Sequence, residues 1–291
     1  LFYAIPILIG VNVITFVLFF VVNTPDDMAR MQLGQKRVSA EAIETWKREH
    51  GYDRPLLINP AARGLGALTD TIFFEKSLKL FRLDFGQSDS GRDIGYDISQ
   101  RMWPSLAIAV PVLVVGLLVH ISVALLIVFF RATYLDVGGV VLCVILMSVS
   151  GLFYIIGGQY LIGKLLRLVP ISGYDTGLTA AKFLVLPVLI GVVSGIGASV
   201  RLYRTLFLEE VNRDYVRTAR AKGLGEAAVM FRHVLRNALI PILTGIVVVL
   251  PLLFMGSLLT ESFFGIPGLG SYTIDAIDMQ DFAIVRVMVF L

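Results

Sequence analysis

The strongest constraint on this chain is a set of long apolar segments that a water-exposed surface would not tolerate. Hydrophobic residue types make up 56% of the 291 residues, whereas charged types make up 16%. A soluble domain of that composition would expose large apolar patches, so we predict an integral membrane protein that contacts lipid. A spanning helix needs about 20 consecutive apolar residues. Six segments approach that length: 1–22, 104–130, 136–158, 181–200, 240–260 and 282–291.

These segments predict an all-α membrane protein, because lipid offers no hydrogen-bond partner to free backbone groups and no segment alternates as barrel strands do. The six segments predict about six transmembrane helices. Because the chain starts without methionine and stops inside an apolar run, we expect both ends to be trimmed and the last helix to be truncated. The expected organisation is a first transmembrane helix at 1–22, an external (periplasmic) loop at 23–103, and a membrane domain at 104–291. Inside the loop, Ser39–His50 is predicted to form a short capped helix ending before Gly51.

The loop charges predict the orientation of the chain. Segment 201–239 carries eight Lys/Arg and four Asp/Glu, whereas 261–281 carries four acidic residues and no Lys/Arg. Basic loops stay in the cytoplasm, which places loop 201–240 inside and both termini inside. The opposite orientation would leave eight cations outside. Three aspartates of 261–281 are interpreted as a solvated outer face, namely Asp275, Asp278 and Asp281. The alternative is that they contact another protein.

The chain lacks the residue patterns of an enzyme. Its single cysteine, Cys143, lies in an apolar run and is predicted to be inert. The three histidines (His50, His120 and His233) fall in separate segments, so no metal site is predicted. No phosphate-binding glycine loop occurs, and a formal net charge of +3 is too small to indicate nucleic acid. We therefore predict no catalytic, cofactor-binding or metal-binding residue, and leave mid-span His120 equally open to a functional and a structural role.

The most informative segment is 209–243, which is predicted to fold as two amphipathic helices joined by a turn. Gly223–Gly225 should end the first helix, because glycine is costly inside helices and permits left-handed backbone. The second helix would resume at Glu226. Small residues around the turn would let a short helix sit closely in a partner's groove. The plainer alternative is a basic loop that only satisfies topology. One stripe at helical spacing is predicted to run through Phe207, Val211, Tyr215, Ala219 and Lys222.

Four ordered motifs resemble one family. They are DFGQS at 84–88, RMWPSL at 101–106, YVRTARAKGL at 215–224 followed by RNALIP at 236–241, and ESFFGIPGLG at 261–270. Together they resemble the inner-membrane permeases of binding-protein-dependent ABC importers, in the dipeptide/oligopeptide/nickel branch. The third motif is similar to that family's cytoplasmic "EAA" loop, aligned on Gly223. The literal Glu-Ala-Ala at 226–228 is out of register, because its glycine position is Arg232.

The resemblance implies a type-1 ABC permease domain over 104–291 in a bacterial inner membrane. It also implies a second homologous permease, two cytoplasmic ATPase subunits that bind the ATP and Mg²⁺, and an external solute-binding protein. Di- or oligopeptides are the expected solute. The implied ATPase-coupling helix comprises Tyr215, Val216, Arg217, Thr218, Ala219, Arg220, Ala221, Lys222 and Gly223. Candidate pathway or gate residues in the last motif are Glu261, Pro267 and Gly268, with helix capping or a structural hydrogen bond as the alternative role of Glu261.

Two other functions remain open from the sequence. An ion-gradient-driven secondary transporter would usually place paired charges or broken helices at mid-membrane. A non-transporting assembly subunit would lack a solute pathway.

Overall fold

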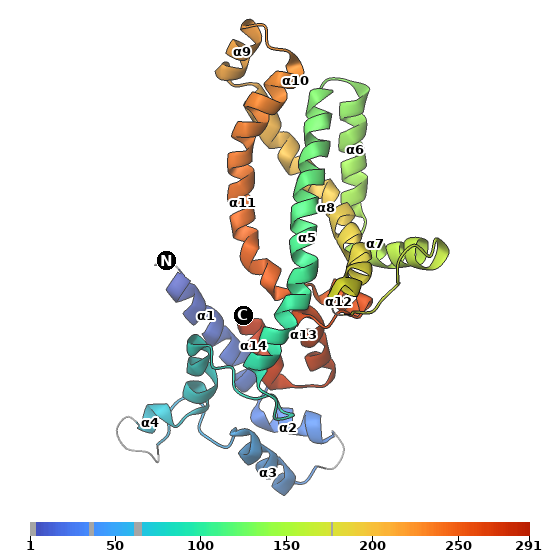
Figure 1. The fold of residues 1–291 in the computed structure, drawn as a ribbon. Helices are drawn as coiled ribbons and strands as arrows, with labels where there is room; N and C mark the ends of the chain where they lie inside the picture. Colours follow the sequence, from blue (N-terminus) through green and yellow to red (C-terminus); the bar gives the residue numbers. More distant parts are fainter. Residues whose placement is uncertain (1–3, 35–37, 61–65, 176) are drawn as a thin grey trace. The chain divides into compact units, whose positions relative to one another are not determined.

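The computed structural model describes residues 4–34, 38–60, 66–175 and 177–291, apart from the side chains at 4 and 178 (Figure 1). It divides into two compact units. Unit 1 comprises residues 1–101 and 272–291, and unit 2 comprises residues 102–271. Within the described residues the regular structure is helical, and the one strand-like feature is an isolated bridge between Gln87 and Asp93.

Unit 1 is built from short helices around an aromatic cluster. Its helices are α1 (Ala4–Phe16), continued by a π-helical segment Val17–Val22, α2 (Pro25–Leu33), α3 (Ala40–His50), α4 (Gly66–Thr69), and α14 (Phe282–Phe290). A π-helical turn Phe73–Ser77 and a 3₁₀ turn Leu78–Arg82 follow α4. Buried rings of Phe16, Phe20, Trp46 and Tyr52 form the centre of the cluster.

The local signals in the loop act as expected. The Ser39 hydroxyl accepts a hydrogen bond from the Ala42 amide at the start of α3, and Gly51 ends α3 in left-handed conformation. This confirms the capped helix predicted at Ser39–His50. At α2, Thr24 and Asp27 form a reciprocal capping box.

Unit 2 contains most of the long helices. Its elements are α5 (Ile94–Phe129, beginning in unit 1), α6 (Tyr134–Ser148), α7 (Gly151–Gly158) with a π-helical continuation Gln159–Leu165, a 3₁₀ turn Gly177–Thr179, α8 (Ala180–Val211), α9 (Asp214–Ala221), α10 (Glu226–Val229) with a π-helical segment Met230–Val234, α11 (Leu235–Met255), α12 (Leu258–Phe264), and α13 (Leu269–Asp278), whose last residues belong to unit 1.

Four described helices are long and apolar enough to cross a membrane: Ile5–Val22, Ile94–Phe129, Ala180–Val211 and Glu226–Met255. A fifth candidate is the pair Tyr134–Ser148 and Gly151–Leu165, which bends by 90°. The apolar segment 136–158 therefore forms two helices with a sharp bend between them. The chain turns at Val149, whose backbone is extended, and an apolar residue at a break leaves the hydropathy of the segment unchanged.

Two helix boundaries also differ from the expected ones. Helix α5 starts at Ile94, ahead of the apolar run expected from 104, because the polar residues before that run continue the same helix. Helix α11 ends at Met255, and the next residue, Gly256, has φ +72°. The expected segment 240–260 is thus interrupted, and α12 follows as a separate helix.

Small residues let α6 and α8 pack along each other. A Cβ added at Gly197 of α8 would overlap the Cys143 carbonyl and the Met147 side chain of α6. A Cβ added at Gly139 of α6 would overlap Ile127 of α5. The Arg204 guanidinium of α8 also bonds the Asp136 carboxylate of α6 through Nε (2.9 Å) and Nη2 (3.0 Å). This two-bond geometry fixes the register of the pair.

Candidate coupling hairpin and apolar groove

Helices α9 and α10 form a compact hairpin at the end of unit 2 where α8 stops and α11 begins (Figure 1). Helix α9 ends at Ala221, and Gly223 then takes φ +83°, the left-handed conformation that glycine adopts without strain. Helix α10 begins at Glu226. The two helices and the glycine turn expected in segment 209–243 are confirmed.

The underside of the hairpin is firmly packed. Val216 and Ala219 of α9 are buried against Phe207 and Val211 of α8, together with Val229, Met230 and Val234. The predicted stripe is confirmed for Phe207, Val211, Tyr215 and Ala219, of which Tyr215 is half-buried against the same cluster. Its last member, Lys222, is wrong, because this residue follows the end of α9 at Ala221 and is exposed. The hairpin is thus an extension of the α8–α11 core.

The opposite face of the hairpin is exposed and cationic. Of the nine predicted coupling residues, Val216 and Ala219 pack inward, Tyr215 donates a hydrogen bond to Glu210, and Arg220 binds Glu226. The remaining five are exposed and line one surface: Arg217, Thr218, Ala221, Lys222 and Gly223. This surface combines positive charge with short side chains, which suits close contact with an acidic groove.

Glu226 fastens the hairpin at its base. Its carboxylate accepts hydrogen bonds from Arg220 Nε (3.1 Å) and Nη2 (2.9 Å), and Arg131 Nη2 lies 3.0 Å from Glu226 Oε1. Arg131 follows α5. The glutamate of the literal Glu-Ala-Ala sequence therefore has a structural role, because it links α9 and the turn after α5 to the start of α10.

An apolar groove runs between α5, α8 and α11. Two cavities of 390 Å³ each share four lining residues, namely Val112, Leu113, Gly191 and Val249. Glu261 borders the first cavity, and His120 borders the second. The His120 Nε2 atom lies 2.9 Å from the carbonyl oxygen of Val192, and Gly116 and Gly195 leave room for its ring. His120 is thus a buried histidine bonded to the neighbouring helix α8.

Segment 256–271 is arranged around the buried carboxylate of Glu261. Its oxygens accept hydrogen bonds from the backbone amides of Ser257 and Ser271, each 3.1 Å away. Gly256 and Gly268 lie so close that a Cβ at either would overlap this carboxylate. The candidate gate residues Glu261 and Gly268 therefore lie together and order the segment, whereas Pro267 is exposed.

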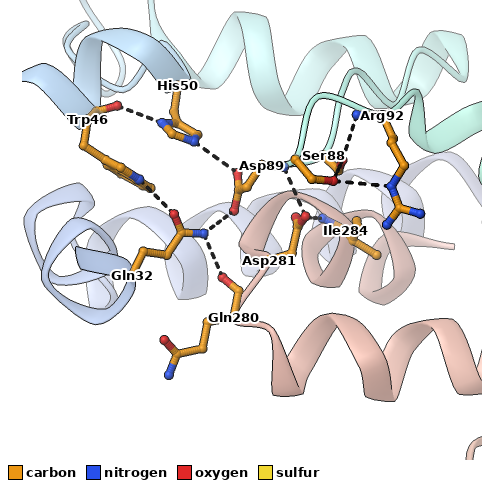
Figure 2. A network of polar contacts seen from close by, with 10 residues as sticks. Gln32, Trp46, His50, Ser88, Asp89, Arg92, Gln280, Asp281 and Ile284 are labelled. Atoms are coloured by element: carbon orange, nitrogen blue, oxygen red, sulfur yellow. Dashed lines mark hydrogen bonds and ion pairs between the residues drawn. The ribbon is translucent and has the colours of Figure 1, made fainter. Parts of the chain in front are cut away.

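A polar network in unit 1 could not be recognised from the sequence (Figure 2). Gln32 Nε2 donates a hydrogen bond to Asp89 (2.8 Å), and Gln32 Oε1 accepts one from the Trp46 indole (2.8 Å). Asp281 caps α14 and accepts the Asp89 amide (3.1 Å), so interpreting Asp281 as a solvated residue was wrong. Its partner lies 192 residues away, and no local pattern encodes such a pairing.

Within the described residues, no group of three or more His, Cys, Asp or Glu side chains is placed to hold a metal ion. The features of unit 2 that could serve a function are its apolar groove and the hairpin, which is packed at one end of the helices that line the groove.

Comparisons with known proteins agree with this arrangement. Residues 129–291 match the family described as "Binding-protein-dependent transport system inner membrane component". A protein of Brucella suis biovar 1 (strain 1330), assigned by name to a peptide transport system as a permease, is 30% identical over 99% of this chain and 88% of its own length. The similarly named protein of Brucella abortus (strain 2308) has the same identity and coverage.

A second group of relatives carries a different solute name. The glutathione transport system permease protein of Salmonella typhimurium (strain LT2) is 28% identical over 99% of this chain and 88% of its own length. These relatives are permease subunits, which are transport components and not enzymes. The family implies a partner permease, an ATPase and a binding protein in general terms. The chain therefore belongs to the inner membrane components of binding-protein-dependent transport systems, and it is the permease component of an ABC importer in the peptide branch.

Proposed function

We propose that this permease forms half of a transmembrane pathway for di- or oligopeptides or related small solutes. A second, homologous permease supplies the other half, and an external binding protein delivers the solute. Two cytoplasmic ATPase subunits bind ATP and Mg²⁺ and drive transport, so this chain itself holds no cofactor.

The observation that carries the proposal is the two-sided hairpin. One side is buried in the α8–α11 core through Val216 and Ala219, and the other exposes Arg217, Thr218 and Ala221. When the ATPases close on ATP, a rigid knob held in their grooves would move with them. The helices attached to the knob would then tilt between inward-facing and outward-facing arrangements.

The groove supports a role in passage. Its lining is mainly apolar, with Gly191 and Ala109 among the small residues that leave space between α5 and α8. Such a wall gives a solute few polar groups to bind tightly, as passage requires. The choice of peptide rests on the relatives, whose names specify peptide and glutathione transport.

The proposed orientation follows from the charge of the hairpin. Basic loops remain in the cytoplasm, which places α9 and α10 inside the cell. Both termini are then cytoplasmic, in a multi-pass chain whose six spans comprise the four long helices, the bent pair and α14.

The test is a change in the turn that shapes the hairpin. At Gly223 a β-branched residue is strained because φ is +83°, although nothing lies within 4 Å of an added Cβ. Gly223→Val should leave the permease in the membrane but uncouple ATP hydrolysis from uptake, lowering uptake per ATP about tenfold in reconstituted vesicles. Gly225→Ala is the matched control, because its backbone is extended and its surroundings are open.

Normal coupling in Gly223→Val would contradict the proposed role of the hairpin. Uptake that persists without ATPase subunits would favour an ion-driven transporter. Copurification with partners that include no ATPase would favour an assembly subunit.

A further inference from the structure

A further cavity, lined by other residues than the apolar groove, lies wholly inside unit 1. It has a volume of 280 Å³. Its lining comprises residues 49, 50, 52, 75, 76, 79 and 84–89 together with Ala283 and Arg286 of α14. The aromatic cluster of unit 1 supplies Tyr52 to its wall. Unlike the groove, this cavity is lined mostly by polar and charged side chains.

Arg286 is the unusual member of the lining. Its side chain is 4% exposed, and within the described part of the chain neither Nε nor Nη1 has a hydrogen-bond partner. Its Cζ atom lies 5.6 Å from the centre of the Phe20 ring. A buried guanidinium whose donors are unused is costly, because the hydration it loses is not replaced.

A second cation lies in the same cavity. Lys76 is half-buried, and its ammonium group lies 5.3 Å from the centre of the Tyr52 ring. Burial, and next the nearby charge of Arg286, lowers the pKa of Lys76. Burial also raises the pKa of the Tyr52 phenol to about 12, so Tyr52 stays neutral and supplies no counter-charge.

The acidic groups around the cavity are engaged elsewhere or lie at its exposed rim. Asp89 accepts Gln32 Nε2 (2.8 Å) and lies 3.9 Å from His50 Nε2, and Glu75 pairs with Arg54 (2.6 Å). Glu49 and Asp84 are exposed. The interior thus holds the two cations Arg286 and Lys76 beside one partly buried carboxylate, Asp89. The exposed rim carries Glu49, Asp84 and Lys79.

We propose that this cavity binds the carboxylate of a small zwitterionic solute, with Arg286 and Lys76 as the cations that receive it. The carboxylate gives the guanidinium an acceptor and offsets the repulsion between the two cations. A monoanion fits better than a dianionic phosphate, because Asp89 and the rim acids already bring negative charge. The rim acids then face the ammonium end of the solute. Only the choice of a peptide as that solute rests on the proposed function.

The test measures binding without ATP and without added binding protein. The assembled membrane complex, in nanodiscs of phosphatidylcholine, is dialysed to equilibrium against radiolabelled dialanine or against dialaninamide, which lacks the carboxylate. Dialanine should bind at least about tenfold more tightly than the amide, as expected for loss of one charge-assisted contact. Arg286→Gln should remove this preference, and Arg286→Lys should keep part of it. Arg48→Gln, which changes an exposed arginine of α3 outside the lining, should bind as the wild type does.

Lys76→Gln provides a second variant if Arg286→Gln does not assemble, and it should weaken dialanine binding by about threefold to tenfold. Equal binding of dialanine and its amide, or unchanged binding by the Arg286 or Lys76 variant, would overturn the proposal. Displacement of dialanine by phosphatidylglycerol in the nanodisc would also overturn it, in favour of a lipid site. The proposed function fails in a different experiment, because its contradiction is normal coupling of ATP hydrolysis to uptake in Gly223→Val. The binding measurement uses neither ATP nor that variant, so the two failures can be distinguished.

Discussion

Arg131 and Glu226 form an ion pair with an Nη2–Oε1 distance of 3.0 Å. The pair ties the turn after α5 to the first residue of α10, and the same carboxylate binds Arg220 of α9. Both hairpin helices are therefore fastened to one point of unit 2. The proposed coupling role requires this attachment, since motion of α9 is transmitted to the long helices only if the hairpin does not move independently of them.

This ion pair can be tested by a double-mutant cycle. Arg131→Gln and Glu226→Gln should each lower the thermal stability of the complex, and the double variant should lose less than their sum. A partly exposed pair contributes about 0.5–1 kcal/mol of coupling energy. Thermal unfolding of the four proteins measures this value. As a control, the losses of stability in Arg131→Gln and in Glu209→Gln, which changes an exposed residue, should add up in their double variant. If the losses of Arg131→Gln and Glu226→Gln also add up in full, the ion pair does not contribute to stability.

Glu261 should be a stability residue. Replacing it by alanine leaves the amides of Ser257 and Ser271 without their acceptor, and a buried unsatisfied donor costs about 1–3 kcal/mol. Glu261→Ala should therefore lower the free energy of unfolding by about 2 kcal/mol or more. Denaturant unfolding in detergent provides the measurement, with exposed Glu209→Ala as the control. An unfolding curve equal to that of the wild type would assign the carboxylate to the solute pathway instead.

Two glycine substitutions should change stability in opposite directions. A Cβ at Gly268 would overlap the Glu261 carboxylate and Ser105 Oγ, so Gly268→Ala should destabilise segment 256–271. Gly245 lies inside α11 and has no atom within 4 Å of an added Cβ, so Gly245→Ala should stabilise by about 0.5–1 kcal/mol. Hydrogen exchange of the two segments distinguishes these effects. Equal protection in Gly268→Ala and the wild type would contradict the close packing.

Ionised Asp27 should stabilise α2 only above its own pKa. Its hydrogen bond from the Thr24 hydroxyl, and next that from the Thr24 amide, lowers the pKa of Asp27 from 3.8. Because the folded value is the lower one, the contribution is present above pH 3.8 and disappears as the pH falls through the folded pKa. Hydrogen exchange of α2, corrected for intrinsic rates, should show this loss in the wild type. The same loss in Asp27→Asn would rule out Asp27 as its source.

The local parts of this fold could be predicted because their causes are local. Ser39 and Gly51 mark the ends of α3, Gly223 marks the turn of the hairpin, and long apolar runs mark four of the helices. The hairpin could be predicted in the same way, from a cationic segment interrupted by glycine. The burial of Val216 could not be predicted, since the break after Val211 shifts the helical register.

The remaining features depend on contacts between distant residues. The 90° bend at Val149 follows an extended backbone that hydropathy does not detect. The hydrogen bond from the Asp89 amide to Asp281 and the position of Arg286 beside Lys76 bring α14 against residues about 200 positions earlier. Burial of these charges is a result of tertiary structure, and their sequence neighbours give no sign of it.

The central claim is that an ATPase holds the exposed face of α9. In a Cys143→Ser background, which removes the chain's one cysteine, Ala221→Cys places a thiol on that face. Ser172→Cys places a thiol on an exposed segment that lies outside the hairpin. Cross-linking of the intact assembly should join position 221, but not position 172, to an ATPase subunit. If Ala221→Cys cross-links to no nucleotide-hydrolysing subunit, or reacts with a membrane-impermeant maleimide added outside the cell, the account is contradicted.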